Sequence, residues 1–236
     1  MKLENYLIEN QDLVIRIKAN PQILKLFSHL SFGWELKEYN KSKFVTDCTL
    51  EYYNNKYLLK SKLFPRFKLK CHRDLISILN EFLIFISYFY TSQIKNFELL
   101  HCCAYQMNNE NLIIFADHKV GKSEFCAMQL LNGAKLLADD LILYNKNTAE
   151  FKSLGFSIRL RRPVKENLLR LIKKDNFISG KRYSYINSKF LNLEKSGKVF
   201  YADNFYSLTK SKKLNQISLN DFFKNINNNK INIYKV

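Results

Sequence analysis

The chain has 236 residues, of which 47% are hydrophobic, enough for one large domain or for a domain with a smaller lobe. Its formal net charge is +17, but lysines outnumber arginines 30 to 8, so the excess does not form the arginine-rich stripe of a nucleic-acid-binding module. The longest apolar segment, residues 75–90, is interrupted by Asn80 and Glu81 and is shorter than the ~18 to 20 residues that span a bilayer, which argues against a membrane span.

The first 70 residues are predicted to form a β-rich accessory lobe. Asn54 and Asn55 separate two apolar runs and are typical of a hairpin turn, and residues 21–30 indicate a short helix. The expected strands are residues 13–17, 44–53, 56–63 and 67–69. This lobe carries no acid, base or phosphate motif, so we expect it to contribute to the choice of substrate and not to chemistry.

Residues 71–236 are predicted to form the second domain, which begins with a long helix. Asp74 is a suitable N-cap, and the helix is expected to run to about Lys95. Its apolar character favours a buried core helix.

Two strands joined by a tight turn are expected next. Residues 98–106 form the first, with His101 inside it, and residues 111–116 form the second, with a turn at 108–110. A single histidine in an apolar strand is most often a core residue, although its position before the next motif makes it a candidate site residue.

Gly121-Lys122-Ser123-Glu124 lies between the strand at 111–116 and a helix expected over residues 125–131. This order is that of a phosphate-binding loop, because backbone N–H groups and the helix dipole at a helix N-terminus attract anions. Lys122 would reach the outer phosphates of ATP, and the Ser123 hydroxyl would ligate Mg²⁺. The candidate nucleotide-binding residues are Ala116, Val120, Gly121, Lys122, Ser123 and Glu124.

The loop departs from the usual pattern in two places. Ala116 stands where the pattern has its first glycine, and Asp117 adds a negative charge beside the expected phosphates. Because of these departures, a nucleotide-binding protein without catalytic activity remains an alternative.

A strand is expected over residues 133–144, with Asp139 and Asp140 in its middle. Neighbouring residues of a strand face opposite sides, so both carboxylates cannot be buried without partners. One or both should therefore lie at a strand end and face a site. Beside a phosphate loop, such a pair can hold Mg²⁺ and accept a proton from a hydroxyl; which aspartate does which stays open, although Asp139 is the expected metal ligand.

Arg159 and Arg161 alternate with apolar residues over 157–163 and are expected on one face of a strand. A pair of arginines suits phosphate or carboxylate recognition, but an ordinary solvated edge is an equal alternative. Beyond them, the sequence predicts a helix over 165–174, a loop over 175–182 and a loop or frayed tail over 225–230.

Together these blocks resemble the HPr kinase/phosphorylase family. The matching residues are Leu100-His101, Gly121-Lys122-Ser123-Glu124, Gly133 and Leu137-Ala138-Asp139-Asp140, within residues 98–165. The resemblance implies an α/β fold with α+β character, in which a phosphate loop lies in a mixed sheet as in phosphoenolpyruvate carboxykinase. The basic C-terminal signatures of true HPr kinases are missing, so the chain is more similar to the small, divergent members of the family, and HPr is a doubtful substrate.

The sequence therefore predicts a kinase that uses ATP and Mg²⁺ to phosphorylate a hydroxyl of a peptide, a protein or a small molecule. The candidate catalytic residues are Asp139, Asp140, His101, Arg159 and Arg161, and the candidate metal ligands are Ser123 and Asp139. A nucleotide-binding protein without catalysis is the first alternative and a basic nucleic-acid-binding module the second. Five cysteines without CxxC spacing, and no cleavable signal pattern in residues 1–12, favour a reduced cytoplasmic protein. The acceptor and the reversibility of the reaction stay open, as does the oligomeric state, with a homo-oligomer among the options.

Overall fold

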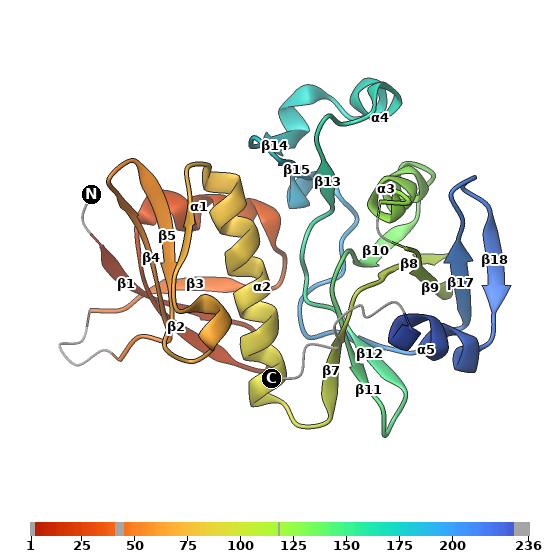
Figure 1. The fold of residues 1–236 in the computed structure, drawn as a ribbon, viewed down its shortest axis with the longest axis horizontal. Coiled ribbons are helices and arrows are strands. Elements are labelled where there is room, and N and C mark those ends of the chain that lie inside the picture. The colour runs from red at the N-terminus through yellow and green to blue at the C-terminus, as the bar shows by residue number, and fades with distance from the viewer. Residues whose placement is uncertain (1–2, 41–44, 118, 229–236) are drawn as a thin grey trace.

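The computed structural model describes residues 3–40, 45–117 and 119–228. In this part of the chain, five α-helices accompany four β-sheets in a mixed α/β architecture (Figure 1). The fold class predicted from the sequence is confirmed at this level.

The N-terminal region is a six-stranded sheet with one helix from the same segment. Its strands, in spatial order, are β3 (Glu35–Glu38), β1 (Glu4–Glu9), β2 (Val14–Ala19), β4 (Cys48–Tyr53), β5 (Lys56–Lys60) and β6 (Lys70–His72). All neighbours are antiparallel except β2 and β4. Helix α1 (Pro21–Leu30) begins after Asn20, whose side chain accepts a hydrogen bond from the Gln22 backbone N–H at 2.9 Å.

The turn at Asn54-Asn55 and the helix at 21–30 are confirmed. The strands predicted over 13–17, 44–53 and 56–63 correspond to β2, β4 and β5, but β4 begins only at Cys48 and β5 ends at Lys60. The prediction of a strand over 67–69 is wrong, because Pro65–Phe67 forms a short 3₁₀ helix, η1, and the strand begins only at Lys70. Strands β1 and β3 were not anticipated. Polar residues interrupt both, and all four residues of β3 are exposed, so neither shows the apolar alternation that marks a strand.

Helix α2 (Leu75–Gln93) lies between the N-terminal sheet and the rest of the molecule (Figure 1). The Asp74 side chain accepts a hydrogen bond from the Ser77 backbone N–H at 2.9 Å, which confirms the predicted N-cap. In the described part of the chain, α2 is the one helix long and apolar enough to cross a membrane, and 72% of its most apolar window is buried inside the protein. Such burial is what a core helix shows, as the sequence indicated.

A five-stranded sheet follows, in the order β10 (Lys135–Ala138), β8 (Cys103–Met107), β9 (Glu110–Phe115), β17 (Asn204–Leu208) and β18 (Leu214–Ile217). The predicted hairpin joins β8 to β9, and its turn residues Asn108 and Asn109 both have positive φ. Ile114 belongs to the core under helix α3 (Lys122–Leu131), whereas Ile113 belongs to the core under α5 (Leu219–Asn228). The sheet is therefore buried on both faces.

Two smaller sheets complete the fold. One contains β16 (Val199–Phe200), β12 (Glu150–Lys152), β11 (Ile142–Asn145) and β7 (Phe97–Leu100), and the other contains β13 (Arg159–Arg161), β15 (Tyr183–Ile186) and β14 (Phe177–Ser179).

Three C-terminal predictions need correction. The helix at 165–174 is shorter and forms α4 (Glu166–Leu171), followed by the 3₁₀ helix η2 (Lys174–Asn176). The loop expected over 175–182 contains strand β14, which pairs with β15. Residues 225–228 end helix α5 and do not form a loop, while residues 229 and 230 lie outside the described part.

The two long strands predicted around His101 and the aspartate pair are both broken. The chain leaves the four-stranded sheet after β7, passes through His101 and Cys102, and enters the five-stranded sheet as β8. Farther along, it leaves the five-stranded sheet after β10, passes through Asp139, Asp140 and Leu141, and enters the four-stranded sheet as β11. Because β7 pairs with β11 and β8 with β10, the two breaks lie side by side.

Candidate functional site

The predicted phosphate loop lies between β9 and α3. Gly121 is the N-cap of α3 and has φ +92°, a left-handed conformation that favours glycine, and the helix begins at Lys122. The Lys122 side chain is buried at 7% exposure, and its ammonium donates one hydrogen bond, 3.3 Å long, to the His101 carbonyl oxygen. A buried ammonium beside a helix N-terminus makes this point strongly attractive to an anion.

Ala116, the main departure from the loop pattern, is buried and is not among the described residues with positive φ. Its backbone therefore has a conformation that any L-residue adopts. Lys119, with φ +67°, has the left-handed conformation instead. Alanine in place of the first loop glycine therefore imposes no backbone strain in this structure. His118 lies outside the described residues.

Asp139 lies at the break after β10 with its side chain buried. Its Oδ2 accepts a hydrogen bond from the Arg159 backbone N–H at 2.9 Å, while its Oδ1 has no hydrogen-bond partner among the described residues. Burial and the neighbouring Asp140 raise the pKa of Asp139 to about 6, although the Arg159 N–H, the Ser123 hydroxyl and the Lys122 charge act in the opposite direction. Asp139 therefore has one oxygen without a partner among the described residues, and its carboxylate interacts with Ser123 in the first turn of α3.

Asp140 is held on both oxygens. Its Oδ1 lies 2.7 Å from His101 Nε2, and its Oδ2 lies 2.6 Å from Arg159 Nη2. Burial would raise the pKa of Asp140, but Arg159, His101 and Lys122 outweigh it and hold the pKa below the ordinary value. The break between sheets gives Asp140 a φ of +68°, so it points toward His101 and Arg159 while Asp139 points toward α3.

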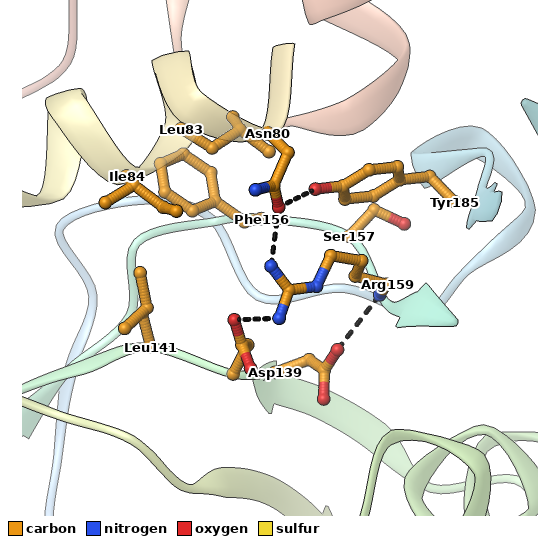
Figure 2. A pocket seen from close by; sticks show the side chains of 10 residues that line it. Asn80, Leu83, Ile84, Asp139, Leu141, Phe156, Ser157, Arg159 and Tyr185 are labelled. Atoms are coloured by element: carbon orange, nitrogen blue, oxygen red, sulfur yellow. Dashed lines mark hydrogen bonds and ion pairs between the residues drawn. The ribbon is translucent and has the colours of Figure 1, made fainter. Parts of the chain in front are cut away.

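Arg159 connects this pair to helix α2. Its Nη1 donates to Asn80 Oδ1 at 2.5 Å, and the Tyr185 hydroxyl donates to the same oxygen at 3.0 Å (Figure 2). The guanidinium also lies 4.9 Å from the centre of the Tyr183 ring. Asp140 and Arg159 are therefore paired with each other, as burial requires.

A pocket opens beside these residues, between α2 and the two aspartates (Figure 2). Its empty volume, including the mouth, is about 280 Å³. Apolar side chains form much of its wall, and Asp139, Asp140, Arg159 and Asn80 form its polar part. The lining residues are Asn80, Leu83, Ile84, Asp139, Asp140, Leu141, Phe156, Ser157, Arg159 and Tyr185.

The structure brings six predicted residues together, namely His101, Lys122, Ser123, Asp139, Asp140 and Arg159. It separates Arg161 from Arg159: the Arg159 side chain is 17% exposed and ion-paired, whereas Arg161 is exposed at the end of β13. Glu124 lies on the outer side of the loop, where it pairs with Lys165 and lies 4.0 Å from Lys212.

Sequence reasoning missed Asn80, Tyr185 and Lys212. Asn80 carried a usable signal, because a polar side chain inside an apolar core helix must find a buried partner. Nothing local marks Tyr185 or Lys212, which reach the site from distant strands and turns.

The described residues contain no group of three or more His, Cys, Asp or Glu side chains that could hold a metal ion. Mg²⁺ does not need such a group, because it is usually held by one or two carboxylates, with water and substrate phosphates completing the shell. The unpartnered Asp139 Oδ1 and the nearby Ser123 hydroxyl are oxygen donors of this kind. The residues present therefore fit a Mg²⁺ ion that is bound together with a nucleotide.

No protein-family model matches the chain, and a search of curated proteins returned no match.

Proposed function

We propose that the protein is a phosphotransferase that uses ATP and Mg²⁺ to phosphorylate a hydroxyl group. One observation carries this proposal: the buried Lys122 ammonium and the unpartnered Asp139 carboxylate oxygen both lie at the N-terminus of α3. A cation there suits phosphate, and a free carboxylate oxygen beside it suits the metal that accompanies phosphate.

In this proposal the loop from Ala116 to Gly121 and the first turn of α3 bind the phosphates. Lys122 holds the outer phosphates, and Ser123 with Asp139 would hold Mg²⁺. The bound ion would neutralise negative charge on the phosphates. The finer architecture, a phosphate-loop core in a mixed sheet as in HPr kinase and phosphoenolpyruvate carboxykinase, belongs to the same proposal. The order β9, loop, α3 and the parallel pairing of β9 with β17 support it.

The acceptor hydroxyl would lie on the pocket side of the aspartate pair. Asp140 lines this pocket, and its carboxylate is fixed by His101 and Arg159 but keeps lone pairs for a further donor. Asp140 orients the hydroxyl and takes its proton while the hydroxyl oxygen bonds to the γ-phosphorus and ADP leaves. His101 and Arg159 position Asp140. The acceptor in this proposal is a hydroxyl of a peptide, a protein or a small molecule that reaches Asp140 at the mouth of this pocket.

A nucleotide-binding protein without transfer is the second candidate. Two observations favour it: Asp117 is exposed beside the loop, and both oxygens of Asp140 already have cationic or hydrogen-bonding partners. This candidate shares the nucleotide site with the first, so turnover of bound ATP separates them.

Calorimetric titration with MgATP tests the nucleotide site. Lys122→Ala should lose most of the ATP affinity, because it removes the buried cation that faces the phosphates. Lys152→Ala is the matched control, since Lys152 is also a buried lysine, at 8% exposure, but pairs with Asp12 at 3.2 Å away from the loop. Equal ATP affinity for Lys122→Ala and the parent protein would refute the assignment of the loop.

A further inference from the structure

Lys212 reaches the phosphate loop from the turn between β17 and β18. Its ammonium donates a hydrogen bond to the Val120 carbonyl oxygen. Two backbone hydrogen bonds fix the turn, from Lys212 N–H to the Thr209 carbonyl and from Thr209 N–H to the Lys213 carbonyl, both 3.0 Å long. Lys212 itself has φ +63°, and the turn holds its backbone where the side chain reaches the Val120 carbonyl.

The Lys212 ammonium occupies the space that Gly121 leaves open. A Cβ built on Gly121 would overlap this ammonium and would lie 3.0 Å from Glu124 Oε2. Glycine at such a position lets a bound phosphate approach the backbone closely. A cation therefore lies in the space beside the α3 N-terminus that an anion would enter.

The charge on Lys212 is only weakly compensated. Its nearest carboxylate oxygen, Glu124 Oε2, is 4.0 Å away and is paired more closely with Lys165. The Lys212 side chain is 37% exposed, and its partial burial and the Lys165 charge lower its pKa more than Glu124 raises it. A second observation points to a ligand at this end of α3: buried Asp139, which interacts with Ser123 in the first turn of the helix, keeps an oxygen without a hydrogen-bond partner among the described residues.

We propose that Lys212 is a second phosphate-binding cation, which leaves the Val120 carbonyl and contacts the phosphate chain of the nucleotide. This inference rests on the proposed function and deepens it, because it names a residue that recognises the polyphosphate and not the base. Lys122 approaches the phosphates from within the helix turn, and Lys212 approaches from the β17–β18 turn. The two lysines then bind the same chain from different elements.

The experiment compares dissociation constants of MgATP and of inorganic tripolyphosphate by calorimetry for the parent, Lys212→Gln and Lys213→Gln. Lys213 is the next residue in the same turn and is exposed like Lys212, and its substitution makes the same change in net charge. Loss of a charge-assisted hydrogen bond typically weakens binding by about 10- to 100-fold. Lys212→Gln should weaken both ligands by this factor, whereas Lys213→Gln should stay within about 2-fold of the parent.

Unchanged affinity in Lys212→Gln would overturn the inference while leaving the proposed function intact, provided that Lys122→Ala still abolishes binding. Tighter binding in Lys212→Gln would also overturn it, since Lys212 would then act as a plug that competes with phosphate. A parent protein that binds neither ligand would refute the proposed function and this inference together. Lys212→Arg, which keeps the charge, should retain most of the affinity and guards against a folding defect in the glutamine variant.

Discussion

The N-terminal region, residues 3–93, and the region that follows, residues 97–228, use polar side chains for different purposes. In the first, Asn20 and Asp74 cap helices, and such groups satisfy local backbone donors. In the second, Lys122, Asp139 and Arg159 are brought together from α3, the break after β10 and β13. Burying charge is costly unless it is paired, so a cluster of buried charges that comes together from several elements is a candidate functional site.

The two regions are nevertheless one structure. The hydrophobic core of the N-terminal sheet continues through α2 to Leu99, Leu143 and Phe156 of the second region. Helix α2 also contributes Asn80 to the wall of the pocket. A boundary at residue 70, which the sequence suggested, thus falls inside β6 and separates most of the sheet from the helix that covers it.

Deletion of residues 1–70 should have the largest effect. The deletion exposes the face of α2 that carries Phe82 and Phe85, both completely buried in the intact protein. We expect loss of cooperative folding, because large apolar side chains would be left in water. Solubility and a thermal melt followed by circular dichroism measure this. A soluble variant with a cooperative melt and full ATP affinity would show that the two regions are independent.

Substitution of either aspartate should have the next largest effect, on turnover. Asp139→Asn removes a proposed metal ligand, and Asp140→Asn removes the proposed proton acceptor, so each should lower kcat by about 10²-fold or more. The Mg²⁺ concentration for half-maximal rate should rise for Asp139→Asn only.

Asp47→Asn is the control in the N-terminal region. Its carboxylate accepts a hydrogen bond from the Arg16 backbone N–H at 2.7 Å, away from the loop. Its kcat should match that of the parent. If both Asp139→Asn and Asp140→Asn keep nearly the kcat of the parent, the aspartate pair has only a structural role in its turn.

Substitution of Asn80 by Leu should have the smallest effect of the three, and it tests whether α2 takes part in the site. Loss of the amide leaves the Arg159 guanidinium and the Tyr185 hydroxyl short of an acceptor, which costs about 1–3 kcal/mol. We expect a lower melting temperature and a changed rate of phosphate transfer at unchanged ATP affinity. Ser87→Ala is a matched change on α2, since Ser87 bonds only to its own helix, at the Leu83 carbonyl. If Asn80→Leu transfers phosphate at the rate of the parent, α2 takes no part in the site, which then lies wholly in the second region.

The sequence by itself determined the local elements that carry the site. Apolar runs with turn residues between them located β8, β9 and their hairpin, and Asp74 with the apolar run after it located α2. The strand, Gly121-Lys122-Ser123 and the helix after it indicated where a phosphate could bind. These features depend on residues within a few positions of one another, where periodicity and capping chemistry act.

Only the tertiary structure decided how the charged side chains meet. Alternation placed Arg159 and Arg161 on one face of a strand, but the packing of β13 against the aspartate break buries one and exposes the other. The breaks at His101 and at Asp139–Leu141 exist because the chain passes between two sheets, which an apolar window of twelve residues does not reveal. Asn80 and Lys212 reach the site from distant elements, and the burial of unlike charges in one place is a property of that long-range packing.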